Sequence, residues 1–175
     1  MVARSKGIDI YTVGSGNPGA SNVARAMGVK WGVLVFALDG LKGAIPAAVG
    51  LLLDSQPGAY LLITAAVLGH MYPVTRHFKG GKGVATMAGA ILVLYPIVFL
   101  ALLVVWYVTR KLTGKASVAS LVLAIALPVG VAIEGAPAWE ILAVVGLVIL
   151  GTLRHLDNIK RLLTGSELSA SQSED

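Results

Sequence analysis

The sequence of 175 residues contains no cysteine and few charged side chains. Without cysteine the chain has no disulfide bond, thiolate nucleophile, cysteine-linked lipid or cysteine-ligated metal. Charged residues make up 13% of the chain, about half the share that is usual in soluble domains. Hydrophobic residues make up 56%, and the mean hydropathy is +0.80. The composition therefore predicts an integral membrane protein, and the length suits a single domain.

Several motifs of exported proteins and of soluble enzymes are also missing. Residues 1–22 contain no apolar core, so we predict no cleavable signal peptide. No histidine is followed by aspartate at the fifth position, and no Gly-x-Ser-x-Gly nucleophile elbow occurs. Three separated histidines without a carboxylate cluster make a poor zinc site. We expect neither a metal nor another cofactor, and no nucleic-acid partner.

Apolar runs dominate the rest of the chain, and a membrane-spanning helix needs about 20 mostly apolar residues. The run 83–109 is too long for one simple span. A break is predicted at Tyr95–Pro96, since proline disfavours helix in the residue before it. Each half then has about 13 residues and spans about 20 Å, which suits a re-entrant helix or a locally thinned bilayer. The other runs are 31–53, 59–74, 117–133 and 138–153.

Loop charge decides between this break and the alternative of one long tilted helix. Lysine and arginine concentrate in the cytoplasmic loops of membrane proteins. If the run 83–109 crosses twice, every basic residue except Lys42 falls on one side, and the loops 54–58 and 134–140 fall on the other. We therefore predict an all-α, polytopic membrane helix bundle of about six segments with both termini cytoplasmic.

The first polar block is "GSGNPGASNVAR", residues 14–25. Its glycines match Gly-x-Gly-x-x-Gly, and Asp39 follows at the distance expected of a dinucleotide site. We reject a dinucleotide site, because the fingerprint requires a preceding strand and Asp39 lies in a membrane segment. The glycines and polar side chains suit an anion, and Arg25 adds a charge for bidentate contact. A turn-rich loop that caps a helix is an equal alternative.

The second block is "GHMYPVTRHFKGGKGVAT", residues 69–86. It is not a Walker P-loop, which needs serine or threonine after Gly-Lys, because Gly83 follows Lys82. What remains is a glycine turn that opens onto an apolar helix, whose N-terminus favours negative charge. A positive-inside loop explains the lysines, but it does not explain Gly80, Gly81 and Gly83.

The third block is "RHLDNIKRLLTGSE", residues 154–167. On a helix, His155 and Asn158 share one face, which is either a ligand wall or a surface that meets lipid headgroups. We favour the ligand role, since histidine acts as a hydrogen-bond donor or base near neutral pH. A weaker fourth block is "TGKASVAS", residues 113–120.

Four other polar residues have plainer interpretations. His70 stands near a helix end as a hydrogen-bonded packing residue, and His77 is expected to be exposed. Asp39 and Lys42 are charges within an apolar run, and their i,i+3 spacing allows an ion pair. Charges inside membranes are often functional, but a buried pair that fixes helix packing is slightly favoured here.

Together the blocks make the sequence similar to the bacterial acyl-phosphate:glycerol-3-phosphate acyltransferases, the PlsY family. The family patterns are "GSGN…GATN…R", "GH…P…FKGGKGVAT" and "RH…NI.RLL.G.E". This chain matches all three in order, with "DGLKG" between the first two, and the match covers nearly the whole chain. Ser21 stands where the family usually has threonine, so the hydroxyl is kept. The family normally has one further N-terminal transmembrane helix, whose cytoplasmic end the segment 2–4 resembles.

The resemblance implies a reaction and a location. The family transfers an acyl group from acyl phosphate to glycerol 3-phosphate, which gives 1-acyl-glycerol 3-phosphate and phosphate in phospholipid synthesis. Acyl phosphate is already activated, so the protein mainly has to position the substrates and stabilise developing charge. A substrate phosphate oxygen is then able to accept the proton. The implied location is the bacterial inner membrane, multi-pass, with cytoplasmic active-site loops and an apolar groove for the acyl chain that opens to the lipid bilayer.

The blocks and the resemblance together give the expected site residues. We expect catalytic roles for Ser15, Arg25, Lys82, His155 and Asn158. Substrate or phosphate binding is expected at Gly16, Asn17, Gly19, Ser21, Asn22, Gly80, Gly81, Gly83, Thr86 and, more weakly, Ser117.

One membrane-embedded domain is expected over residues 1–165, followed by a polar, disordered tail over 166–175 without a function of its own. Two other function classes stay open from the residues alone. An anion transporter, in which the halves around Pro96 are broken helices, predicts flux without chemistry. A structural membrane protein predicts that neither substrate binds.

Overall fold

The computed structural model describes residues 2–169, and these residues form helices and loops without a β-strand. The longer helices are α2 (Val29–Leu52), α3 (Gln56–Met71), α4 (Val84–Leu94), α5 (Pro96–Thr113), α6 (Ala116–Ile133) and α7 (Ala138–Leu153). The shorter ones are α1 (Ala20–Met27), α8 (Leu156–Leu163) and the 3-10 turns Arg4–Lys6 and Val74–Arg76. The prediction of an all-α fold is confirmed.

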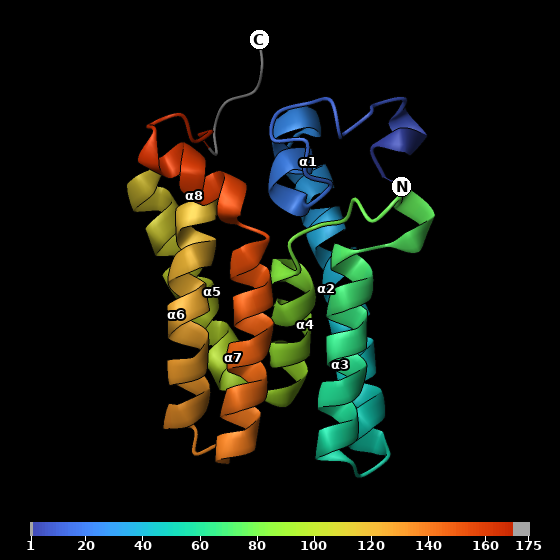
Figure 1. Cartoon of the computed structure of the whole chain (residues 1–175), viewed down its shortest axis with the longest axis vertical. Coiled ribbons are helices and arrows are strands. Elements are labelled where there is room, and N and C mark those ends of the chain that lie inside the picture. The colour runs from blue at the N-terminus through green and yellow to red at the C-terminus, as the bar shows by residue number, and fades with distance from the viewer. Residues whose placement is uncertain (1, 170–175) are drawn as a thin grey trace.

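Helices α2 to α7 run alternately down and up the bundle, and they correspond to the predicted membrane segments (Figure 1). Helices α7 and α8 form a bent pair, with an angle of 58°, that qualifies together as a possible span. Helix α4 has only 11 residues, about 16 Å at 1.5 Å per residue, so it is a short segment as predicted. Four segments are each long and apolar enough to cross a membrane: Val29–Leu52, Gln56–Arg76, Pro96–Thr113 and Ala116–Ile133.

The polar blocks gather at one end of the bundle. The N-terminal loop with α1 (blue), the loop between α3 and α4 (green) and helix α8 (red) all lie at this end (Figure 1). The junction between α5 and α6, where the fourth polar block begins, lies there as well. The predicted clustering of the basic loops on one side is therefore present in the fold.

The predicted break in the run 83–109 is confirmed, because α4 ends at Leu94 and α5 begins at Pro96. Tyr95 between them has a φ of −140°. Proline is well suited to the first position of a helix, where its missing N–H would have no helical partner. The Tyr95 hydroxyl donates a hydrogen bond to the carboxylate of Glu140, a buried residue in the first turn of α7. The turn between α4 and α5 is thus hydrogen-bonded to α7.

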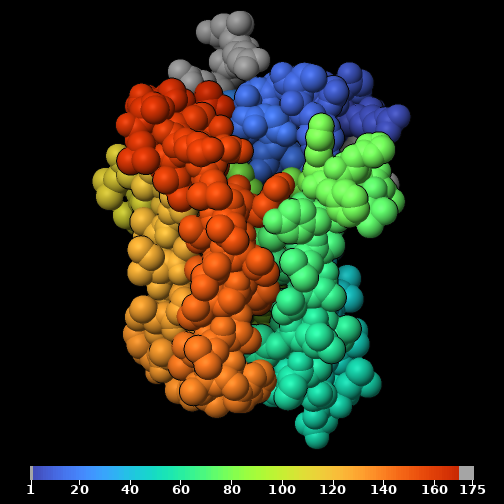
Figure 2. All heavy atoms as spheres, in the orientation of Figure 1, coloured from blue at the N-terminus to red at the C-terminus, as the bar shows by residue number. Residues whose placement is uncertain are grey.

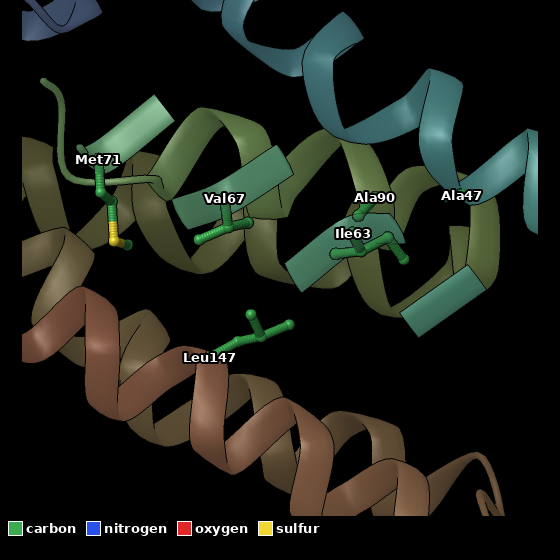
Figure 3. Packing of buried hydrophobic residues seen from close by; sticks show 6 residues of the cluster. All are labelled: Ala47, Ile63, Val67, Met71, Ala90 and Leu147. Atoms are coloured by element: carbon green, nitrogen blue, oxygen red, sulfur yellow. The ribbon is translucent and has the colours of Figure 1, made fainter. Parts of the chain in front are cut away.

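A hydrophobic core lies where α2, α3, α4 and α7 meet. Ile63, Val67 and Met71 follow one another at i,i+4 spacing on α3, so they share one face of that helix. Figure 3 shows this row opposite Leu147 of α7, with Ala90 of α4 beside it. Each of these five side chains is buried, and the row fixes α3 against the rest of the bundle.

Helices α2 and α4 approach each other closely through glycines. A Cβ atom at Gly43 would lie 1.8 Å from the carbonyl oxygen of Thr86. A Cβ atom at Gly89 would lie 1.9 Å from the carbonyl oxygen of Gly40. Small residues at helix contacts are typical of packing inside membranes, where close backbone approach replaces the hydrophobic effect as a source of stability.

Candidate active site

A cavity of about 470 Å³ lies between α2, α4, α5, α6 and α7 and reaches the polar end of the bundle. Ligand sites usually have volumes of about 300–1,000 Å³, with apolar walls and a few polar groups. The polar lining comes mainly from the three blocks and includes Ser15, Arg25, Lys82, His155 and Asn158. The apolar lining comes mainly from α5 and α6 and includes Phe99, Leu102, Leu103, Trp106, Leu121 and Ala124.

The sequence segments that form the polar end are far apart along the chain. Figure 2 shows the N-terminal segments (blue), the loop after α3 (green) and α8 (red) gathered at this end of the molecule. The cavity therefore combines residues that only the folded chain brings together.

The side chain of Asn22 makes hydrogen bonds that hold the first polar block and the segment before it together. Its side-chain oxygen accepts hydrogen bonds from the backbone N–H of Ser15 at 3.0 Å and from Arg25 Nη1 at 3.1 Å. Its amide nitrogen donates to the carbonyl oxygens of Ile10 at 3.3 Å and Val13 at 2.9 Å. Because the oxygen of this buried amide is engaged within the block and its nitrogen binds the segment just before it, Asn22 shapes the loop and orients Arg25 toward the cavity.

Two glycines of this block are required by the backbone conformation of the loop and by its close contacts. Gly14 has a φ of +56°, and a Cβ atom there would lie 2.5 Å from Asn22 Oδ1. Gly16 has a φ of +66°, and a Cβ atom there would lie 2.9 Å from the carbonyl oxygen of Tyr11. The predicted turn-rich loop before α1 is therefore present, and its polar side chains line the cavity, while anion binding by this block stays a prediction.

Lys82 joins the second block to the third. Its ammonium group donates a hydrogen bond to the side-chain oxygen of Asn158. Burial, helped by the positive charge of Arg161, lowers the pKa of Lys82 to about 8. Gly83, with a φ of +81°, caps the start of α4, whose first N–H groups have no partner within the helix. A phosphate at this point would accept hydrogen bonds from those groups and favour the charged form of Lys82.

His155 lies at the junction of α7 and α8, and its ring is buried. Its Nδ1 atom is 2.8 Å from the carbonyl oxygen of Gly151. A carbonyl oxygen only accepts, so Nδ1 carries the proton and Nε2 of the neutral ring keeps a lone pair. Burial, with the nearby charge of Lys82, lowers the pKa of His155 to about 4. The neutral ring is therefore suited to accept a hydrogen bond from a hydroxyl group and to orient it.

Glu167 brings a carboxylate to the same end of the cavity. It accepts hydrogen bonds from Asn158 Nδ2 at 2.6 Å and from Arg161 Nε at 2.8 Å. The Ser117 hydroxyl faces this carboxylate but stays outside hydrogen-bonding geometry. Burial by itself would raise the pKa of Glu167, yet these polar neighbours outweigh burial and lower it. Glu167 is thus held as a carboxylate that fixes the orientation of Asn158.

The beginning of the expected tail takes part in this arrangement. Glu167 and Leu168 line the cavity, and the carbonyl oxygen of Ser169 accepts a hydrogen bond from Arg25 Nε at 3.1 Å. Residues 170–175, to which the expectation of disorder also applied, lie outside the described residues. The segment after α8 therefore connects the first and third blocks.

Most of the expected site residues line the cavity, and four do not. Those in the lining are Ser15, Asn17, Gly19, Ser21, Asn22, Arg25, Lys82, Gly83, Ser117, His155 and Asn158. Gly16 faces Tyr11 instead, Gly80 and Gly81 pack on His70, and Thr86 is buried where α4 meets α2. These four positions shape the loops or the helix contact around the cavity.

Three other residues of the cavity lining had been given no ligand role from the sequence. Arg110 had been counted only among the basic residues of the cytoplasmic side, yet it lines the cavity with its guanidinium 5.5 Å from the ring of Trp106. The i,i+4 spacing of Trp106 and Arg110 was the feature of the sequence that indicated their contact on one face of a helix. Asp39 and His70 also line the cavity, and the predicted ion pair of Asp39 with Lys42 is present at 2.6 Å. Over residues 2–169, no group of three or more His, Asp or Glu side chains is arranged to hold a metal ion.

Known proteins share both the sequence and the fold. The family model described as "Glycerol-3-phosphate acyltransferase" matches residues 1–165. The chain is 43% identical over 169 residues to the glycerol-3-phosphate acyltransferase of Aquifex aeolicus (strain VF5), a match that covers 95% of this chain and 88% of that one. It is 44% identical over 170 residues to that of Anaeromyxobacter sp. (strain K), with coverages of 92% and 83%.

Two crystal structures of PlsY (YgiH), an integral membrane glycerol 3-phosphate acyltransferase, superpose on this fold. The glycerol 3-phosphate form gives a TM-score of 0.92 at 42% identity, and covers 96% of this chain and 85% of that one. The lysophosphatidic acid form gives a TM-score of 0.90 at 41% identity with the same coverages. These likenesses favour the enzyme over the transporter. The chain belongs to the glycerol-3-phosphate acyltransferase family and is an integral membrane acyltransferase.

Proposed function

We propose that this protein transfers the acyl group of an acyl phosphate to glycerol 3-phosphate at the cytoplasmic face of the bacterial inner membrane. The products are 1-acyl-glycerol 3-phosphate and inorganic phosphate. The observation that carries the proposal is the cavity, which has Arg25 and Lys82 at its polar end and apolar side chains along α5 and α6. Both substrates carry a phosphate and one carries an acyl chain, so each part of the cavity matches a substrate group.

The charge of the polar end supports phosphate binding. Arg25, Lys82 and Arg110 line the cavity. The two carboxylates in the lining, Asp39 and Glu167, each have a basic partner, at 2.6 and 2.8 Å. The cationic side chains are therefore in excess at the site, and cationic groups in a partly buried cleft attract anions strongly.

The reaction needs positioned groups rather than a covalent protein intermediate. The C1 hydroxyl oxygen of glycerol 3-phosphate forms a new bond to the acyl carbonyl carbon, and the bond from that carbon to the phosphate oxygen breaks. The hydroxyl proton passes to an oxygen of the released phosphate, while Nε2 of His155 accepts a hydrogen bond from the hydroxyl group and orients it. Lys82 and the first N–H groups of α4 stabilise charge on a phosphate group during this exchange. Holding both substrates in one cavity supplies the proximity.

The distribution of apolar and basic residues supports the proposed location. Helices α2 to α7 carry many exposed large hydrophobic side chains, which suit contact with lipid. The basic loops lie at the end of the bundle that holds the site, and the positive-inside rule supports a cytoplasmic location for this end. An acyl phosphate then places its chain among α5 and α6 and its phosphate at the polar end.

Phosphate release by the purified protein tests this function. Wild-type protein in liposomes is expected to release phosphate from palmitoyl phosphate only when glycerol 3-phosphate is present. Lys82→Ala and Arg25→Ala are each expected to lower kcat/KM roughly 100-fold or more, since each removes a charge that stabilises phosphate. Lys79→Ala is the matched control, because Lys79 is an exposed lysine of the same loop. Near-normal rates in the first two variants would overturn the assignment.

A further inference from the structure

His70 lies directly against the glycine loop, residues 80–83, which precedes α4. The backbone N–H of Gly81 donates a hydrogen bond to the carbonyl oxygen of His70 at 3.2 Å. A Cβ atom at Gly81 would lie 2.1 Å from His70 Nε2, and one at Gly80 would lie 2.1 Å from the His70 carbonyl oxygen. A side chain does not fit at such distances, so the two glycines allow the loop to rest directly on His70.

The other side of the His70 ring meets a carboxylate from a different helix. His70 Nδ1 lies 3.6 Å from Asp39 Oδ1, which is close enough for an ion pair but longer than a hydrogen bond. The same oxygen of Asp39 accepts a hydrogen bond from Lys42 at 2.6 Å. The side chains of His70 and Asp39 are only 9% and 10% exposed. These three residues form a column that runs from α2 to α3 and ends under the loop.

Arg154 holds the loop by its carbonyl groups. Its Nη2 atom donates to the carbonyl oxygen of Gly80 at 3.1 Å, and its Nε atom donates to that of Gly81 at 3.4 Å. The loop is therefore clamped between Arg154 and His70. Lys82 follows directly after the clamped glycines, so its position in the cavity depends on where the clamp holds the loop.

Joining two helices through a buried pair of ionisable side chains carries a large free-energy cost of desolvation. Apolar side chains of similar volume would pack α2 against α3 at a lower desolvation cost. Asp39 and His70 instead line the cavity and support the loop that carries Lys82. The buried polar groups of Asp39 and His70, and their position beside the loop, therefore indicate a functional role in addition to helix packing.

We propose that Asp39 and His70 are positioning residues that hold the glycine loop so that Lys82 and the first turn of α4 meet a substrate phosphate. The inference rests on the proposed function, because it assigns the phosphate of glycerol 3-phosphate to this loop. Asp39 fixes the His70 ring, and the ring fixes Gly81. Neither residue has to touch the reacting atoms.

Two substitutions that preserve shape test this role. Asp39→Asn keeps the outline of the side chain and removes its charge, and His70→Phe keeps a ring under Gly81 without its nitrogens. Each is expected to lower kcat/KM for glycerol 3-phosphate roughly 10- to 100-fold, because small displacements of a positioning group carry losses of that order. Asp54→Asn is the matched control, since Asp54 is exposed in the loop between α2 and α3 at the opposite end of the bundle.

Thermal unfolding with and without glycerol 3-phosphate separates positioning from packing. A ligand that binds the folded state raises the unfolding temperature, and we expect this rise in the wild type and in Asp54→Asn. Asp39→Asn and His70→Phe are expected to unfold close to the wild-type temperature without ligand and to lose most of the rise. If one variant does not fold, the other decides.

Normal kcat/KM and a normal ligand-dependent rise in both variants would overturn the inference. Failure of both variants to fold would also overturn it and assign the pair to helix packing. A wild-type protein that is stabilised by glycerol 3-phosphate but releases no phosphate would refute the proposed function alone, because the unfolding measurement would still decide the positioning role.

Discussion

The ammonium group of Lys82 and the side-chain oxygen of Asn158 are hydrogen-bonded across 76 positions of sequence. Asn158 also donates from its amide nitrogen to Glu167 at 2.6 Å. The amide is therefore held in one orientation, with its oxygen toward a cation and its nitrogen toward a carboxylate. Through this contact the loop before α4 and the helix α8 form one polar wall of the cavity.

Removing the amide of Asn158 is expected to loosen that wall. Asn158→Ala leaves Lys82 without this acceptor and Glu167 without one donor, so we expect kcat/KM to fall roughly 10- to 100-fold. Asp157→Ala is the control, because Asp157 is the exposed neighbour on the same helix. Steady-state kinetics with both substrates measures the effect, and a change within about twofold at Asn158 would contradict the role.

The pH dependence of the reaction is expected to report on Lys82. Its pKa of about 8, instead of 10.5, means that the ammonium group is mostly present at pH 7 and mostly lost above pH 9 or so. Phosphate binding should weaken accordingly, so kcat/KM is expected to fall as the pH rises through about 8. Lys82→Arg keeps its charge throughout this range and is expected to lose the alkaline fall. A wild-type profile that stays flat to pH 9.5 would contradict this assignment.

The close contact of α2 and α4 predicts a clear difference between two glycines. Gly89→Ala places a methyl group 1.9 Å from the carbonyl oxygen of Gly40, so the helices must separate at a cost of roughly 1–3 kcal/mol. Gly146 of α7 has no atom within 4 Å of an added Cβ, and Gly146→Ala is expected to be neutral or to stabilise by up to about 1 kcal/mol. Thermal unfolding in detergent compares them, and equal effects would refute the packing argument.

The floor of the apolar cavity is expected to influence the preferred acyl chain. Ile91 and Leu127 line both the main cavity and a small void of about 10 Å³, so they stand between the two spaces. Leu127→Ala is expected to join the spaces and shift the ratio of kcat/KM for octadecanoyl over dodecanoyl phosphate upward by roughly tenfold. Ile149→Ala, at a residue of α7 that is 54% exposed, is the control. An unchanged ratio in Leu127→Ala would show that the chain does not reach this floor.

The succession of apolar helices and the break at Tyr95–Pro96 followed from the sequence because their signals are local. Pro96 restricts the residue before it, and loop charge fixes which segments share a side. The ion pair of Asp39 with Lys42 was equally predictable, since both residues lie on one helix at i,i+3 spacing. Each of these inferences depends on residues that are close in sequence.

The packing contacts of single loop and helix residues could not be predicted from the sequence, because these contacts are made with other elements of the fold. The glycines at 80 and 81 suggested a phosphate cradle, and the structure shows in addition that both pack closely on His70, while phosphate binding stays a prediction. Thr86 lies in the first turn of α4 as expected, but its side chain is buried at the contact with α2. A motif gives the residue types, and the helix rotation that decides which side they face comes from packing.

The most direct test of the account is the stoichiometry of the reaction in liposomes that contain the purified protein. With palmitoyl phosphate and labelled glycerol 3-phosphate, we predict one labelled 1-acyl-glycerol 3-phosphate for each phosphate released, and no release when glycerol 3-phosphate is left out. Passage of label into the liposome lumen without an acylated product, or phosphate release that does not depend on glycerol 3-phosphate, would contradict the account.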